Sequence, residues 1–151
     1  MPIDACTVVH RWFEEVWNQG REETIDELST TDAIAHGLSD GRSDVCGPAG
    51  FKVFWRKIRS ALPDVHIRIE DAIVQGGKAV VRVVLEGTHL GQGLGLPPTG
   101  HRVLVTGTVI FRIESGQIAE AWNNWDQLGL LRQLGAIPAP QGPDRSLSAQ
   151  A

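Results

Sequence analysis

Tyrosine is absent from this chain of 151 residues, although the chain contains five tryptophans and four phenylalanines. A mechanism that depends on a tyrosine hydroxyl is therefore excluded. Basic clusters are missing as well. The 14 lysines and arginines are outnumbered by 18 acidic residues, which gives a net charge of −4. This balance argues against nucleic acid and against an anionic membrane surface as partners.

Cysteine is scarce. The two cysteines, Cys6 and Cys46, form neither a CxxC motif nor a metal-type spacing. We expect both to be reduced thiols in a cytoplasmic protein, and a disulfide between them is the alternative. The five histidines are scattered, without HxH or HExxH spacing, so we expect no metal site. No arrangement of residues marks a nucleophilic cysteine or serine.

Long apolar runs are also missing. Asp4, His10 and Arg11 interrupt the N-terminal stretch, so we expect no signal peptide. No segment has the length needed to cross a bilayer. With 42% hydrophobic and 21% charged residues, the composition is that of an ordinary globular protein. We predict one domain over residues 1–137, followed by a disordered tail over 138–151 that is rich in Pro, Ala, Gln and Ser.

The first third of the chain has helical periodicity. Apolar spacing predicts helices over 3–19 and 22–29, and a third helix that begins near Pro48 and ends before Pro63. Such apolar stripes usually pack into a core. The alternative is that some of their large side chains line a cavity, and the candidates are Trp12, Val16, Phe51 and Trp55.

After residue 63 the apolar period changes to two, which predicts strands. Gly76-Gly77 and Ser115-Gly116 are tight-turn signals that predict two hairpins. Counting outward from the first turn places Asp71 opposite Arg82. The same count from the second turn places Val105 opposite Asp126. It also predicts that Trp122, Asn124 and Asp126 share one face, unless a bulge changes the register.

Residues 87–100 form a loop rich in glycine and proline. No helix is predicted after this loop, so it lacks the context of a phosphate-binding loop. We interpret it as a long connection that folds over a site. His89 and His101 flank the loop, either at the mouth of that site or as ordinary surface histidines.

Helices followed by long strands predict an α+β domain, in which a curved antiparallel sheet wraps around the N-terminal helices. The sequence also resembles a known family, the SnoaL-like polyketide cyclases within the nuclear transport factor 2-like, cone-shaped α+β barrels. The resemblance covers residues 3–137. The motifs that carry it are Trp17-Asn18, Pro63-Asp64, Gly87-Thr88-His89-Leu90-Gly91, Pro98-Thr99-Gly100, Ile118-Ala119-Glu120-Ala121-Trp122 followed by Asp126, and Gln133-Leu134-Gly135.

The resemblance implies a homodimer with a deep apolar pocket in each subunit. It also implies cofactor-independent ring closure of an apolar polyketide by intramolecular aldol condensation. Asp126 matches the aspartate that acts as acid and base in the family, and His36 matches a frequent pocket histidine. For Asp126 the alternative is a carboxylate that caps the turn Gln127 to Leu131. For His36 the alternative is a hydrogen-bonded wall residue.

Further candidates for substrate binding follow from these positions. Arg82 is suited to hold the developing charge of an enolate, or alternatively to form an ion pair with Asp71. Trp122 and Asn124 are candidate walls of the pocket. Two other activities on this scaffold are disfavoured. An epoxide-hydrolase-like site needs an Arg-x-Asp pair, which Arg82-Val83-Val84 lacks, and a steroid-isomerase-like site needs a tyrosine. A non-catalytic binder of apolar small molecules remains the alternative function.

Overall fold

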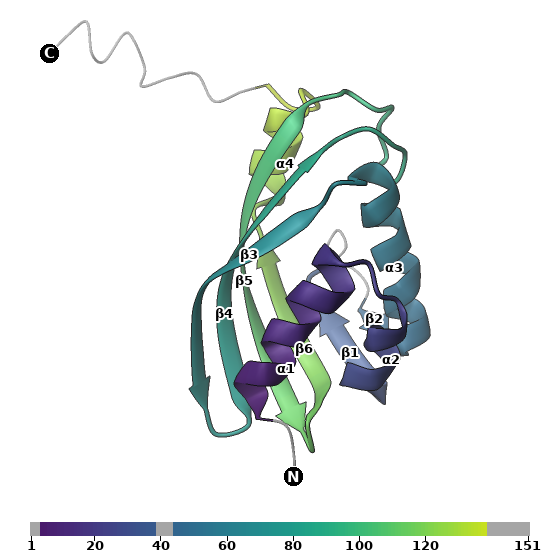
Figure 1. The fold of residues 1–151 in the computed structure, drawn as a ribbon. Helices are drawn as coiled ribbons and strands as arrows, with labels where there is room; N and C mark the ends of the chain where they lie inside the picture. The colour runs from purple at the N-terminus through teal and green to yellow at the C-terminus, as the bar shows by residue number, and fades with distance from the viewer. Residues whose placement is uncertain (1–3, 39–43, 139–151) are drawn as a thin grey trace, which may run out of the picture.

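The computed structural model describes residues 4–38 and 44–138 and has an α+β architecture (Figure 1). Its elements are α1 (Ala5–Arg11), the π-helix η1 (Trp12–Asn18), α2 (Glu23–Leu28), β1 (Ser29–His36), β2 (Val45–Cys46), α3 (Gly47–Ala61), β3 (His66–Gln75), β4 (Lys78–Thr88), β5 (Arg102–Glu114), β6 (Gln117–Trp125) and α4 (Gln127–Gln133). The tail that we predicted to be disordered lies, from residue 139 onward, outside the described residues.

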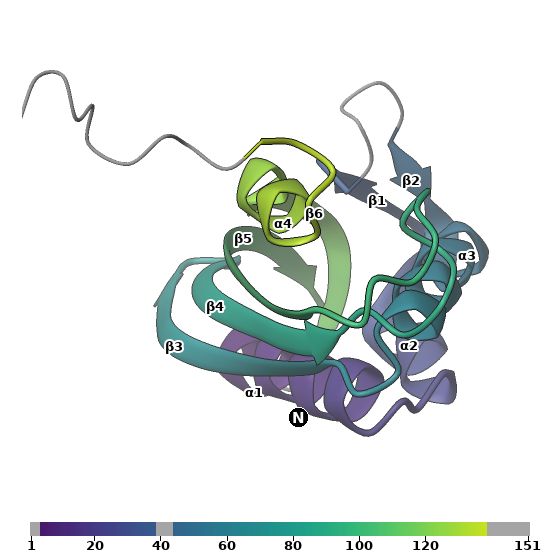
Figure 2. The ribbon, with the colours of Figure 1, turned by 90° about the horizontal axis from the view of Figure 1, so that it is seen from above.

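One curved sheet organises the domain. Its strand order is β2-β1-β6-β5-β4-β3, and every pairing is antiparallel except that of β1 with β6. The N-terminal helices and α3 lie along its concave side, and α4 stands beside the end of β6 (Figures 1 and 2). The predicted fold class is confirmed. The sheet is not closed into a barrel, because β2 and β3 are its edges.

The first predicted helix is divided into α1 and the π-helix η1. A π-helix closes i to i+5 hydrogen bonds. Trp12, Phe13, Val16 and Trp17 of this segment are all buried. The Gln19 amide donates to the Glu14 carbonyl at 2.9 Å and completes this turn.

The register of the first hairpin is confirmed, and the predicted register of the second hairpin is wrong by one residue. Asp71 lies opposite Arg82 as predicted. In the second hairpin Ile110 lies opposite Trp122, because a bulge between Arg112 and Ile113 gives β6 an extra residue. The Asp126 amide therefore bonds the Thr106 carbonyl, at 3.0 Å, and Val105 is not its partner.

This correction exchanges the two faces of β6. Ala121, Asn123 and Trp125 face the concave side, where they line a cavity. Trp122 and Asn124, which alternate with them along the strand, face outward.

Two smaller features also concern the described residues. Cys6 and Cys46 are both exposed and are not paired with each other. In ranges 4–38 and 44–138, no helix has both the length and the apolar character required to cross a membrane.

Candidate functional site

A cavity of about 260 Å³ lies between the concave side of the sheet and the helices. Its volume is near the lower end of small-molecule sites, which span roughly 300–1,000 Å³. The helices contribute aromatic side chains to the wall, and the strands contribute mainly aliphatic ones. The lining includes Trp12, Phe13, Trp17, Phe51, Phe54, Ile58, Leu85, Leu94, Val105, Phe111, Ala121, Trp125, Leu130 and Leu134.

Aromatic contacts fix the helical wall. The ring centroids of Trp12 and Phe51 are 4.9 Å apart, and Trp17 meets Phe51 edge-on at 6.1 Å. Trp12 and Phe51 thus line the cavity, which was the alternative to simple core packing. The other two candidates lie behind the wall. Val16 is fully buried, and Trp55 donates its indole N–H to the Val16 carbonyl at 3.0 Å.

Few polar side chains reach the cavity. Apart from the tryptophans, the polar residues that line it are Ser29, Asn123 and Gln127, and none of its described lining residues is ionisable. Two hydrogen bonds fix the Asn123 amide. Its Nδ2 donates to the His36 carbonyl at 3.0 Å, and its Oδ1 accepts from the Trp125 indole at 3.2 Å.

Asp126 ends β6 and starts α4. Its Oδ1 accepts from the Gly129 amide at 2.9 Å, which makes it the N-cap of α4. Asp126 therefore caps α4, as the alternative interpretation described, and this contact does not test a role in proton transfer. Trp125 and Gln127, its neighbours in the chain, both line the cavity. Asp126 itself borders a hollow on the outer face, together with Arg82, Thr106, Thr108 and Asn124, and Trp125 borders both spaces.

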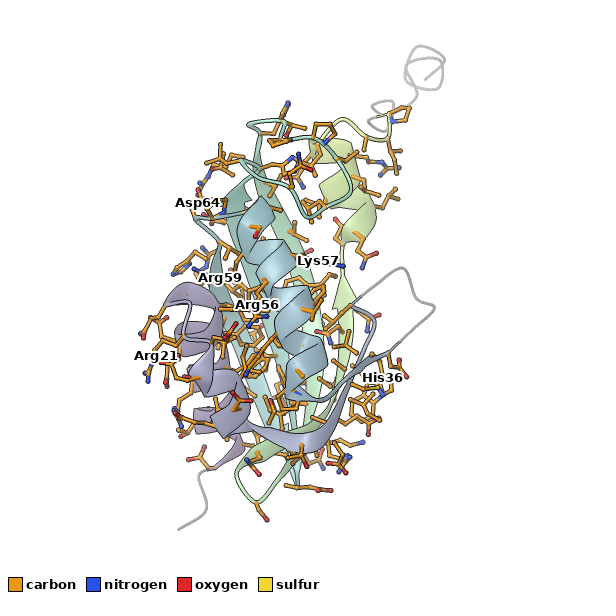
Figure 3. All side chains as sticks on the ribbon, turned by 90° about the vertical axis from the view of Figure 1, so that its right-hand side faces the viewer. Arg21, His36, Arg56, Lys57, Arg59 and Asp64 are labelled. Carbon is orange, nitrogen blue, oxygen red and sulfur yellow. The ribbon has the colours of Figure 1, made fainter. Side chains whose placement is uncertain are left out.

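His36 belongs to a polar cluster on the outer face of the sheet. Its Nδ1 lies 2.8 Å from Asp44 Oδ1, and its Nε2 lies 2.6 Å from Glu120 Oε2. The hydrogen bond to Glu120, and secondly that to Asp44, raises the pKa of His36 above 6.5. The imidazole stacks on Trp122 at 5.7 Å. Figure 3 shows His36 near the margin of the molecule. No described contact joins it to Asp126.

Arg82 is also an outer-face residue. Its Nε donates to Asp71 Oδ2 at 2.7 Å, and both side chains are 59% exposed. This is the ion pair that we considered as its alternative role. Trp122 and Asn124 share this face because of the corrected register, so they are not walls of the apolar cavity.

The loop between β4 and β5 packs directly on α3 (Figure 2). A Cβ at Gly91 would lie 1.9 Å from the Ser60 carbonyl oxygen, so only glycine fits there. Leu94 of this loop lines the cavity. His89 is fully buried and accepts from the Thr99 amide at 3.2 Å, so it anchors the loop and does not line the cavity. His101 is exposed.

The sequence interpretation missed Asn123, Trp125 and Gln127 as cavity residues. One signal was available. Ile118 and Ala119 are consecutive apolar residues, and both are buried, which breaks the alternation of a regular strand. A bulge placed there gives the observed faces of β6.

A family model and two relatives from Streptomyces indicate one family. A family model described as SnoaL-like polyketide cyclase matches residues 7–134. The chain is 28% identical over 135 residues to an aklanonic acid methyl ester cyclase of Streptomyces peucetius, with 87% of this chain and 92% of that protein covered. It is 29% identical over 126 residues to the nogalonic acid methyl ester cyclase of Streptomyces nogalater, with 79% and 89% covered.

Solved structures have a similar fold. A candidate SnoaL-like polyketide cyclase from Jannaschia sp. CCS1 has a TM-score of 0.79 at 27% identity, with 88% of this chain and 92% of that chain covered. TsrD from Streptomyces laurentii has a TM-score of 0.78 at 29% identity, with 89% and 99% covered.

Proposed function

This chain belongs to the SnoaL-like polyketide cyclase family, and from that membership we propose that it is a cofactor-independent cyclase. It closes a ring of a neutral, apolar small molecule by intramolecular aldol condensation. The observation that carries the proposal is an apolar cavity lined by Trp125 and Gln127, the two chain neighbours of the carboxylate-bearing residue Asp126.

The cavity favours an uncharged ligand. A buried carboxylate without a cationic partner costs several kcal/mol, and none of the described lining residues supplies a cation. An ester therefore binds better than the corresponding acid. The named relatives from Streptomyces are cyclases of methyl esters, which is consistent with this preference. Aromatic side chains such as Trp12 and Phe51 suit a flat ring system.

We assign the proton transfers to Asp126. Its carboxylate takes a proton from the carbon next to a ligand carbonyl, which leaves an enolate. The enolate carbon forms a bond to a second carbonyl carbon of the same molecule, and the resulting alkoxide recovers the proton from Asp126. Acid–base help of this kind contributes roughly 10²–10⁴ in rate. The reacting carbon would lie beside Trp125 and Gln127, the lining residues next to Asp126 in the chain.

Asp126→Asn tests this assignment cleanly. Asparagine is as good an N-cap as aspartate, so the variant keeps the cap of α4 and removes only the proton chemistry. We expect ester ligands to bind with unchanged affinity while turnover falls at least about 100-fold. Asp32→Asn, the same change at an exposed residue of β1, is the control for altered charge. An Asp126→Asn variant with wild-type turnover would refute the assignment.

A non-catalytic binder is the second candidate. It is favoured by the position of the Asp126 carboxylate, which is held by Gly129 and does not line the cavity. Such a protein would bind neutral aromatic esters and return them unchanged. Incubation with a polyketide methyl ester, followed by liquid chromatography with mass detection, distinguishes a cyclase from a binder. Aldol ring closure changes the retention time of the ester without changing its mass, and a binder leaves both unchanged.

We also propose a homodimer in the cytoplasm. The homodimer rests on the family resemblance, and the free thiols Cys6 and Cys46 suit a reducing compartment. Light scattering of the purified chain measures the oligomeric state, and fractionation of cells measures the location.

A further inference from the structure

We propose that Asn123 is the polar anchor of the cavity, where its carboxamide holds a carbonyl oxygen of an aromatic ligand. The inference rests on the proposed function, in which that oxygen becomes the enolate oxygen. It names a residue for substrate recognition that acts separately from the proton transfers of Asp126.

The geometry of the Asn123 amide supports this role. A carboxamide offers two N–H donors and two acceptor lone pairs. One donor is used by the His36 carbonyl, at 3.0 Å, and one lone pair by the Trp125 indole, at 3.2 Å. One N–H and one lone pair remain, on a group that lines the cavity. The second N–H is the donor for the ligand.

The two existing bonds also make the amide rigid. The His36 carbonyl on β1 holds the nitrogen of the amide, and the Trp125 indole on β6 holds its oxygen. The chain after β1 passes unusually close, since a Cβ at Gly37 would lie 2.2 Å from the Asn123 carbonyl oxygen. A donor that is already oriented needs no reorganisation when charge develops on the ligand oxygen.

The surroundings make this donor selective. A hydrogen bond is stronger in an apolar cavity than in water, and a buried donor left unpaired is costly. A ligand with a carbonyl at this position therefore binds better than a hydrocarbon of the same shape. Of the other polar lining residues, Gln127 is exposed, and Ser29 offers a single hydroxyl where Asn123 offers an amide that two hydrogen bonds already orient.

The test compares two ligands of one shape. Fluorenone carries a single carbonyl oxygen, and fluorene lacks it. We expect the wild type to prefer fluorenone, and Asn123→Leu to bind fluorenone roughly 10-fold more weakly while its affinity for fluorene stays unchanged or rises. Asn124→Leu is the matched control, because it makes the same change one residue along β6 on the outer face, and it should keep the preference.

Trp125→Phe gives a second measurement if Asn123→Leu does not fold. It keeps an aromatic ring in the wall but removes one tether of the amide, so the preference for fluorenone should fall by a smaller factor. Equal losses for both ligands in Asn123→Leu would indicate a packing role and overturn the proposal. So would wild-type affinity for fluorenone in that variant, or equal effects of the two leucine substitutions.

The outcome is independent of catalysis. If the protein turns over no ester but the fluorenone preference disappears in Asn123→Leu, the role of Asn123 as the anchor is supported and the cyclase assignment is refuted. If the protein turns over esters but the preference persists in Asn123→Leu, the cyclase assignment is supported and the role of Asn123 is refuted.

Discussion

The carboxylate of Asp126 is bound to the amide of Gly129, with Oδ1 2.9 Å from the nitrogen. The contact is close enough that a Cβ at Gly129 would lie 2.1 Å from Asp126 Oδ2. Gly129 thus makes room for the cap at the first turn of α4. The residue proposed as the acid and base also caps the helix that carries Leu130 and Leu131 of the cavity wall.

The first prediction separates these two roles. Asp126→Ala should lower the free energy of unfolding by about 0.5–2 kcal/mol, because the Gly129 amide loses its partner, while Asp126→Asn should change it by only a few tenths. Urea denaturation of both variants measures the difference. Equal destabilisation by alanine and asparagine would show that the cap does not stabilise the fold.

His36 gives a prediction about pH. Its pKa is raised in the folded state by Glu120 and Asp44, so its contribution to stability is complete below about pH 6.5 and disappears as the pH rises through the raised pKa. The pKa of Glu120 is lowered, chiefly by the hydrogen bond from His36, so both partners are charged between the lowered pKa of Glu120 and the raised pKa of His36.

We therefore expect His36→Gln to reduce the melting temperature most near about pH 6 and least near about pH 9. Melting curves across this range, with His101→Gln as the control for loss of an exposed histidine, measure the effect. A loss that is larger at high pH than at low pH would contradict the assigned ion pairs.

The contrast between the two hairpins shows what sequence patterns can determine. The turn Gly76-Gly77 fixed the pairing of Asp71 with Arg82, because counting from a two-residue turn is reliable where the facing pairs near the turn are regular. The same count failed beyond Ser115-Gly116, since one extra residue in β6 inverts every later side chain.

The error extended to the site. The position of Asp126 at the end of β6 could be predicted because it depends on the order of residues in the chain. The place of Trp12 and Phe51 in the wall could be predicted because it depends on the helical period. Asn123 was missed in favour of Asn124, because that choice depends on a single bulge. Similarly, the position of His36 in the sequence could not show that its side chain points outward. That direction depends on the parallel pairing of β1 with β6.

The loop over α3 gives a third prediction. Gly91→Ala places a methyl group 1.9 Å from the Ser60 carbonyl oxygen, which is backbone and cannot rotate away. We expect a loss of about 1–3 kcal/mol in stability and weaker ligand binding, because Leu94 leaves the wall. Gly95→Ala, at a positive φ of 76° but with open space around its Cβ, should cost only about 1–2 kcal/mol. Protease cleavage within the loop provides an independent readout, and equal cleavage of both variants would count against the clash.

Gly107 and Trp125 give the last prediction. They lie opposite each other on β5 and β6, and a Cβ at Gly107 would lie 2.5 Å from the Trp125 ring. Gly107→Ala must displace this ring, which strains its hydrogen bond to Asn123 and should cost about 1–3 kcal/mol.

Trp125→Leu removes the obstructing ring, so the same Gly107→Ala change should cost less in that background. A double-mutant cycle of unfolding free energies measures the coupling, which we expect to exceed about 0.5 kcal/mol for residues in contact. Additive costs would mean that the alanine is accommodated by the backbone of β5. The ring would then keep its place, and Gly107→Ala should leave the fluorenone preference at Asn123 intact.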